Sequence, residues 1–116
     1  MTPFVKLLTK VLGVVLLLAG IAGFFMGGNL FGFEVDTMHN LVHIVSGVIG
    51  LAASGSYRNS RLFLIVFGVV YGAVALLGYA TGGVLGLFSV NMADNHLHAV
   101  IAAACLLTGF GSSSNG

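Results

Sequence analysis

Two long stretches of this chain carry no charged side chain. Residues 11–28 and residues 62–93 contain no Asp, Glu, Lys or Arg. The hydrocarbon core of a bilayer is about 30 Å thick, and about 20 consecutive apolar residues cross it as a helix. Because the first stretch can cross once and the second can cross and turn back, we expect the chain to fold within a membrane.

The composition also predicts helices. Apolar residues make up 58% of the chain and charged residues only 6%, whereas a soluble surface is about 25–35% charged. Within lipid every backbone polar group must find a partner in its own segment, which favours an all-α fold. The single cysteine, Cys105, offers neither an intramolecular disulfide nor a zinc pattern.

The second half of the chain reads onto the first at a constant offset of 55 residues. The matching pairs include Gly13 with Gly68, Gly23 with Gly78, Asn40 with Asn95, and His43 with His98. Such self-similarity indicates two tandem repeats, over about residues 5–53 and 61–110. The first apolar stretch resembles a signal peptide, but its counterpart lies inside the chain. We therefore expect it to be retained as a span.

The repeat predicts an integral membrane four-helix bundle of two tandem two-helix repeats. We expect spans over residues 5–25, 37–53, 62–79 and 93–110, within one transmembrane domain that covers residues 1–116. Residues 54–61, rich in Ser, Gly and Asn, are expected to connect the repeats. Residues 111–116 are expected to form a flexible tail.

The charges predict the orientation of the bundle. In the four-span arrangement one side carries the cations Lys6, Lys10, Arg58 and Arg61, and the other carries the anions Glu34, Asp36 and Asp94. Positive residues stay on the cytoplasmic side, so both termini should be cytoplasmic. Since each repeat has two spans, the repeats run in a parallel orientation and equivalent residues lie at equal depth.

Two sets of polar residues lie at the beginning of the second and fourth spans, at equivalent positions of the repeats. They are His39, Asn40 and His43 in the first repeat, and Asp94, Asn95 and His98 in the second. Small residues continue the faces of the two equivalent histidines, which indicates that these faces point into the bundle. One interpretation is structural, with Asn40, His43, Asn95 and His98 acting as hydrogen-bond partners between helices.

The same residues also suit two kinds of ligand site. His43 and His98, with Asn40 and Asn95 beside them, could bind a tetrapyrrole cofactor such as haem or chlorophyll through paired imidazoles. Alternatively, His39, His43, Asp94 and His98 together form a donor set that zinc, iron or copper accepts. His96 is expected to point away from this group.

The sequence segments that contain these polar residues resemble those of a known family. Residues 30–51 and 85–109 resemble a bacterial family of small four-span membrane proteins catalogued as domain of unknown function 4383, with Asn40, His43, Asn95 and His98 as its signature. The resemblance implies a multi-pass protein of the bacterial inner (cytoplasmic) membrane, with a thylakoid membrane as the alternative. It implies no substrate.

We therefore predict a non-enzymatic protein, because no nucleophile lies beside a base. It would be an accessory or scaffold subunit of a larger membrane complex, in contact with lipids and with other subunits or further copies of itself. One alternative is a small transporter or channel, and another is a metal-binding membrane protein with a His/Asp site near the outer face. Four scattered cations do not form a nucleic-acid surface.

Overall fold

Four helices make up most of the part of this protein that the structure describes. The computed structural model describes residues 2–30, 32–86 and 88–112. Its helices are α1 (Thr2–Gly23), α2 (Thr37–Ala53), α3 (Tyr57–Thr81) and α4 (Met92–Gly111). The all-α prediction with four helices is confirmed. The span expected over residues 37–53 coincides with α2 at both ends.

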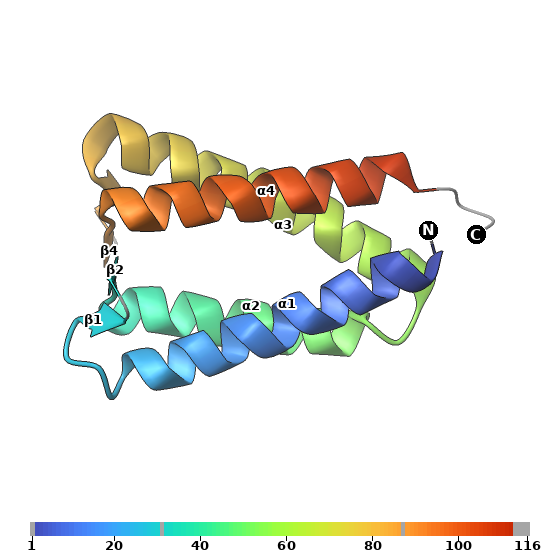
Figure 1. The fold of residues 1–116 in the computed structure, drawn as a ribbon, viewed down its shortest axis with the longest axis horizontal. Coiled ribbons are helices and arrows are strands. Elements are labelled where there is room, and N and C mark those ends of the chain that lie inside the picture. The colour runs from blue at the N-terminus through green and yellow to red at the C-terminus, as the bar shows by residue number, and fades with distance from the viewer. Residues whose placement is uncertain (1, 31, 87, 113–116) are drawn as a thin grey trace.

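Short strand pairs close the turn inside each half of the chain. Strand β1 (Asn29–Leu30) pairs antiparallel with β2 (Phe33–Glu34), and β3 (Gly83–Val84) pairs antiparallel with β4 (Phe88–Ser89). These pairs lie at one end of the bundle, whereas α1 begins and α4 ends at the other (Figure 1). The loops within each half therefore gather at a single end.

The helices pack as two hairpins, α1 with α2 and α3 with α4 (Figure 1). Glycine allows the close approach within each hairpin. A Cβ at Gly13 would lie 2.9 Å from the backbone nitrogen of Leu51, and one at Gly68 would lie 2.7 Å from Cγ of Leu106. Small residues at such crossings bring helices into backbone contact, as in membrane bundles.

The two hairpins meet mainly along α1 and α3. One buried cluster joins Val5 of α1 to Phe63 and Leu64 of α3. A polar contact lies beside it, because the Thr9 hydroxyl, which donates to the carbonyl of Val5 at 2.9 Å, is also 3.3 Å from the carbonyl oxygen of Ser60. These contacts fix how the hairpins sit against each other.

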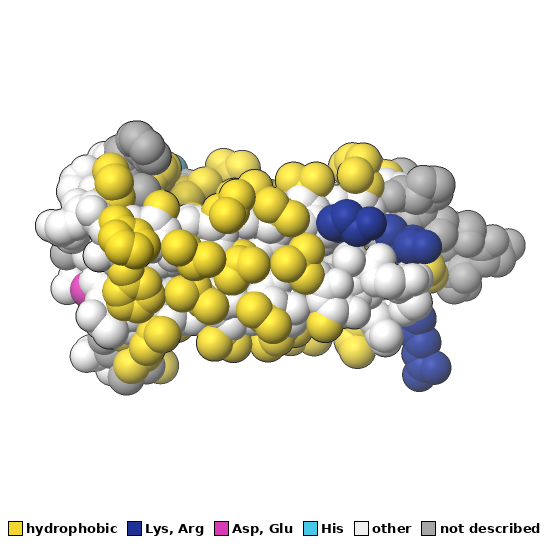
Figure 2. Space-filling view, turned by 90° about the horizontal axis from the view of Figure 1, so that it is seen from below, with side chains coloured by type: hydrophobic (Ala, Val, Ile, Leu, Met, Phe, Trp, Pro, Cys, Tyr) yellow, Lys and Arg dark blue, Asp and Glu magenta, His cyan; other side chains and the backbone are white. Residues whose placement is uncertain are grey.

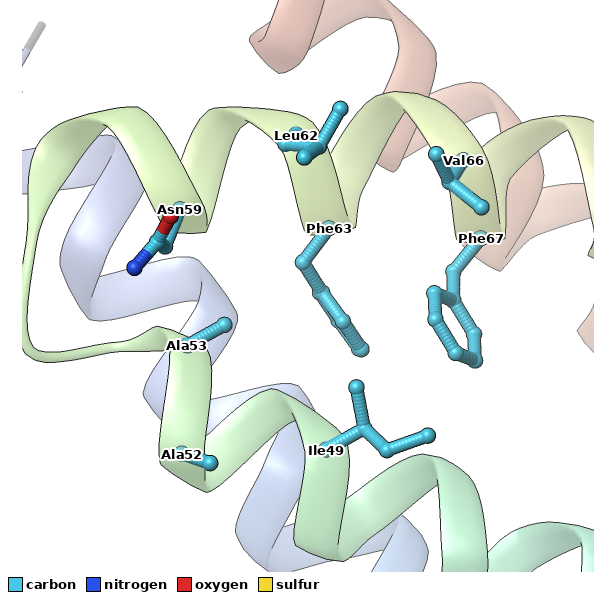
Figure 3. A pocket seen from close by; sticks show the side chains of 8 residues that line it. All are labelled: Ile49, Ala52, Ala53, Asn59, Leu62, Phe63, Val66 and Phe67. Carbon is cyan, nitrogen blue, oxygen red and sulfur yellow. The ribbon is translucent and has the colours of Figure 1, made fainter.

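An open groove remains between α2 and α3, where the two hairpins separate (Figure 3). Its volume is about 430 Å³. The lining residues are Ile49, Ala52, Ala53, Asn59, Leu62, Phe63, Val66 and Phe67. Apart from Asn59, all of these side chains are apolar.

The expected connection over residues 54–61 is wrong in its second half, because α3 already begins at Tyr57. Ser56 caps the helix by accepting a hydrogen bond from the backbone nitrogen of Asn59 at 3.1 Å. Serine is a strong N-cap, so the polar residues after it remain helical. The predicted tail also begins differently: Gly111 is the last residue of α4, and residues 113–116 lie outside the described residues.

The outward faces of the helices are apolar. Leucines that are more than half exposed occur on three helices: Leu7, Leu18, Leu62, Leu76 and Leu107. Figure 2 shows this apolar surface along the length of one face, with Lys and Arg side chains gathered toward one end and acidic colour at the other. The segment Phe4–Gly23 and all of α3 are long and apolar enough to cross a membrane.

Candidate metal centre

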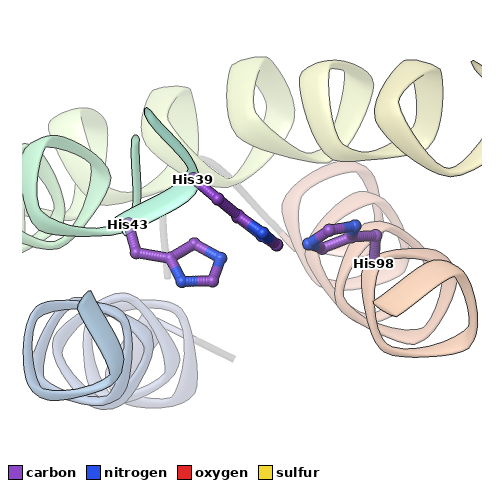
Figure 4. Close-up of side chains that lie close together, drawn as sticks. All are labelled: His39, His43 and His98. Atoms are coloured by element: carbon purple, nitrogen blue, oxygen red, sulfur yellow. The ribbon is translucent and has the colours of Figure 1, made fainter. Parts of the chain in front are cut away.

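Three buried histidines meet between the hairpins. His39 and His43 come from α2 and His98 comes from α4 (Figure 4). The ring centroid of His39 lies 4.4 Å from that of His43 and 5.5 Å from that of His98, and the His43 and His98 centroids are 6.2 Å apart. One ligand atom from each ring lies within 4.8 Å of the other two.

The start of α2 positions two of these rings. The carboxylate of Asp36 accepts a hydrogen bond from the backbone nitrogen of His39 at 2.8 Å and so caps the helix. Residues four apart share a helix face. The cap therefore places His39 and His43 in the first two turns, on the side that faces α4.

The start of α4 positions the third ring through a capping box. Asn91 accepts from the backbone nitrogen of Asp94, and the Asp94 carboxylate accepts from that of Asn91, each at 2.9 Å. His98 follows one turn later. Asp94 is buried, but it lies outside the group of three close ligand atoms.

The two loops that carry the strand pairs are tied together over this end of the bundle. The side-chain nitrogen of Asn91 donates to the carbonyl of Gly32 at 2.9 Å, and the backbone nitrogen of Ser89 donates to the Asp36 carboxylate at 3.4 Å. Both bonds join one half of the chain to the other. They hold the starts of α2 and α4, and hence the three imidazoles, in one arrangement.

The cluster is closed off from its surroundings. The exposed fractions of His39, His43 and His98 are 1%, 6% and 2%. Within the described part of the chain, Nδ1 of His43 and Nδ1 of His98 are buried and make no hydrogen bond. A buried polar atom left in this state costs about 1–3 kcal/mol. Bonds to a metal ion would give imidazole nitrogens here a partner.

The two asparagines contact the neighbouring helix of their own hairpin by close packing. Their amide oxygens make no hydrogen bond within the described residues. Instead, Asn40 packs against Gly23 and Asn95 against Gly78, so closely that a Cβ on either glycine would overlap the amide. Each asparagine thus lies at a close contact within its own hairpin, and among the described residues its amide oxygen does not make the expected hydrogen bond between helices.

A fourth aromatic side chain borders the cluster and was not expected from the sequence. Tyr71 of α3 is 3% exposed, and its ring centroid lies 5.5 Å from that of His98. The only sequence signal was a lone tyrosine in the middle of an apolar helix. His96, by contrast, is exposed and its Nδ1 lies 2.6 Å from the Tyr79 hydroxyl.

Fold and site together define a small all-α protein with two candidate membrane helices and a buried cluster of three histidines. The chain belongs to the family described as Domain of unknown function (DUF4383), whose family model matches residues 6–111. The family resemblance inferred from the sequence is thus confirmed. No curated protein and no solved structure matches the chain.

Proposed function

We propose that this protein is a non-enzymatic four-span membrane protein that binds one transition-metal ion between His39, His43 and His98. The observation that carries the proposal is the convergence of three buried imidazoles from two helices, with ligand atoms within 4.8 Å of one another. Binding by groups from facing helices is a common way for bundles to hold metals.

The distances support a site that closes on an ion with little movement. At a zinc–nitrogen bond of about 2.0–2.1 Å, two tetrahedral ligand nitrogens lie about 3.3 Å apart. The ligand nitrogens now lie within 4.8 Å of one another, so they need to approach by at most about 1.5 Å. Side-chain rotation can provide this movement. Three imidazoles suit Zn²⁺ or Cu²⁺ and leave a fourth coordination position open.

The same geometry favours an ion over a tetrapyrrole. A haem or chlorophyll held by His43 and His98 needs a flat macrocycle between the two rings or beside one of them. The imidazole of His39 already fills that region, at 4.4 Å and 5.5 Å from the other two ring centroids. A macrocycle would have to displace it, whereas an ion uses it as a ligand.

Membrane insertion and orientation are part of this proposal. The apolar outer faces favour four spans, and α2, with 17 residues, is about 26 Å long, close to the bilayer core. The cations at one end favour a cytoplasmic position for both termini. The histidine cluster would then lie beneath the outer surface of the bacterial cytoplasmic membrane.

Metal analysis of the purified protein tests the proposal. Protein in detergent is stripped with a chelator, loaded with Zn²⁺ or Cu²⁺, dialysed and measured by inductively coupled plasma mass spectrometry. We expect one ion per chain. His39→Ala, His43→Ala and His98→Ala should each weaken binding at least about tenfold, since even outer-shell partners contribute that much.

The chain offers a matched control for this experiment. His96→Ala removes an exposed histidine from the same helix as His98 and should leave the stoichiometry at one. A wild-type protein that retains no ion would overturn the proposal. An equal loss in His96→Ala and His98→Ala would overturn it as well, because it would place the ion elsewhere.

A further inference from the structure

The groove between α2 and α3 has a defined shape and chemistry. Phe63 and Phe67 point from α3 toward Ile49 of α2, and the small side chains of Ala52 and Ala53 leave the space open on the α2 side (Figure 3). The groove lies far along the bundle from the histidines, since Ala53 ends α2 and His39 lies near its beginning.

The length of the groove matches one leaflet. Its α3 lining runs from Asn59 to Phe67, a rise of about 12 Å at 1.5 Å per residue. One leaflet contributes about 15 Å of hydrocarbon. In the orientation proposed above, Asn59 lies at the cytoplasmic interface and Phe67 lies near the bilayer centre. The occupant should therefore be apolar and extend from the interface inward.

The volume argues against a partner helix as the occupant. A helix is about 10–12 Å across, so 12 Å of it takes up about 900 Å³ or more. The groove holds about 430 Å³. A helix would rest on the rim, whereas the groove has room for a single hydrocarbon chain along Ile49, Leu62 and Val66.

The charge at the mouth of the groove selects the head group. Arg58 is exposed, precedes the lining residue Asn59 and lies one turn before the lining residue Leu62, which places it at the edge of the groove. Arg61 is turned toward α4, where its Nε donates to the carbonyl of Gly109 at 2.8 Å. Of the two arginines of α3, Arg58 is therefore the one free to reach a head group at the edge of the groove, and guanidinium pairs well with phosphate.

We propose that this groove binds one acyl chain of an anionic phospholipid of the cytoplasmic leaflet, with the lipid phosphate at Arg58. This inference rests on the proposed membrane orientation but not on the metal site. The lipid would fill the gap that the hairpins leave between α2 and α3, in the leaflet opposite the histidines.

Native mass spectrometry of the detergent-purified full chain tests the proposal with phosphatidylglycerol and phosphatidylcholine as probes. We expect the wild type to prefer phosphatidylglycerol, and Arg58→Gln to reduce that preference about fivefold, as expected for one cation near an anionic head group. Ala52→Phe fills the groove and should weaken the binding of both lipids.

Two control variants separate these effects from general ones. Lys6→Gln removes an exposed cation from α1, and Ala103→Phe enlarges an exposed alanine of α4. Neither residue lines the groove. Equal lipid binding by Ala52→Phe and Ala103→Phe, or an equal loss of preference in Arg58→Gln and Lys6→Gln, would overturn the inference.

The proposed membrane orientation and the proposed lipid site can be tested separately. Resistance to alkaline carbonate extraction reports insertion, and labelling of the termini reports orientation. If the protein is inserted as proposed and the groove variants behave like their controls, the lipid site alone is rejected. If extraction removes the protein from membranes, the membrane placement and the lipid site are both rejected.

Discussion

The side-chain amide oxygen of Asn40 on α2 lies directly against Gly23 on α1, where a Cβ on residue 23 would overlap it. Asn95 on α4 lies in the same way against Gly78 on α3. The two asparagines and the two glycines are each separated by 55 residues. The same close packing thus relates the depth of α2 to that of α1 and the depth of α4 to that of α3, and with it the depth of His43 and His98.

Gly23→Ala and Gly78→Ala should therefore destabilise the protein. The added methyl group must displace the asparagine amide or separate the helices, and overpacking of this kind costs about 1–3 kcal/mol. Titration of detergent-purified protein with sodium dodecyl sulfate, followed by circular dichroism, measures the free energy of unfolding.

Gly72→Ala is the control for these variants. A Cβ at Gly72 would lie 3.7 Å from Cβ of Ala102, an ordinary contact. This variant should be as stable as the wild type or slightly more so, because alanine favours the helix. Equal destabilisation by Gly72→Ala and Gly78→Ala would contradict the role assigned to the asparagines.

The element boundaries show what local sequence signals can predict. The limits of α2 follow from a capping Asp36 and from the polar and small residues after Ala53. The start of α3 was missed because residues 54–61 were all assigned to the connection for their Ser, Gly and Asn content, whereas in the structure Ser56 caps the helix. The short strand pairs were missed too, since loops rich in glycine carry little strand signal.

The site depends on contacts that the sequence does not encode locally. Helical spacing predicts that His39 and His43 share a helix face, and in the structure their ring centroids are 4.4 Å apart. The approach of His98 depends instead on the docking of one hairpin against the other. That docking arises from contacts such as Thr9 with Ser60, which no periodicity reveals.

Metal binding should stabilise the folded state if the three histidines form the proposed site. A ligand that binds only the folded protein adds about 2.7 kcal/mol at a free concentration 100 times its dissociation constant. Zn²⁺ should therefore raise the unfolding temperature of wild-type protein in detergent, as measured by differential scanning fluorimetry.

This shift should disappear in His98→Ala and persist in His96→Ala. The two variants remove histidines from the same helix, one buried in the cluster and one exposed. A shift of the same size in both variants would show that stabilisation by Zn²⁺ comes from another place on the protein.

Cysteine labelling of spheroplasts, before and after lysis, tests the proposed topology. Ser89 lies at the end of the bundle that carries the strand pairs, and Gly55 lies in the connection between α2 and α3; both are exposed. Ser89→Cys should react with a membrane-impermeant maleimide in spheroplasts, and Gly55→Cys should react only after lysis. The native Cys105 is 1% exposed and should add little background. The reverse pattern would invert the proposed orientation.

Asn91 combines two roles that can be separated by substitution. Its side-chain oxygen caps α4 and its side-chain nitrogen binds the carbonyl of Gly32 in the other half of the chain. Asn91→Ser keeps a capping oxygen but loses the bond to Gly32, and should cost about 0.5 kcal/mol, the low end for an exposed hydrogen bond. Asn91→Ala also loses the cap, which adds about 1 kcal/mol.

Hydrogen exchange should rise in the loop around Gly32 in both variants and at the start of α4 only in Asn91→Ala. Unchanged exchange around Gly32 in both variants would show that this bond does not hold the two strand-pair loops together.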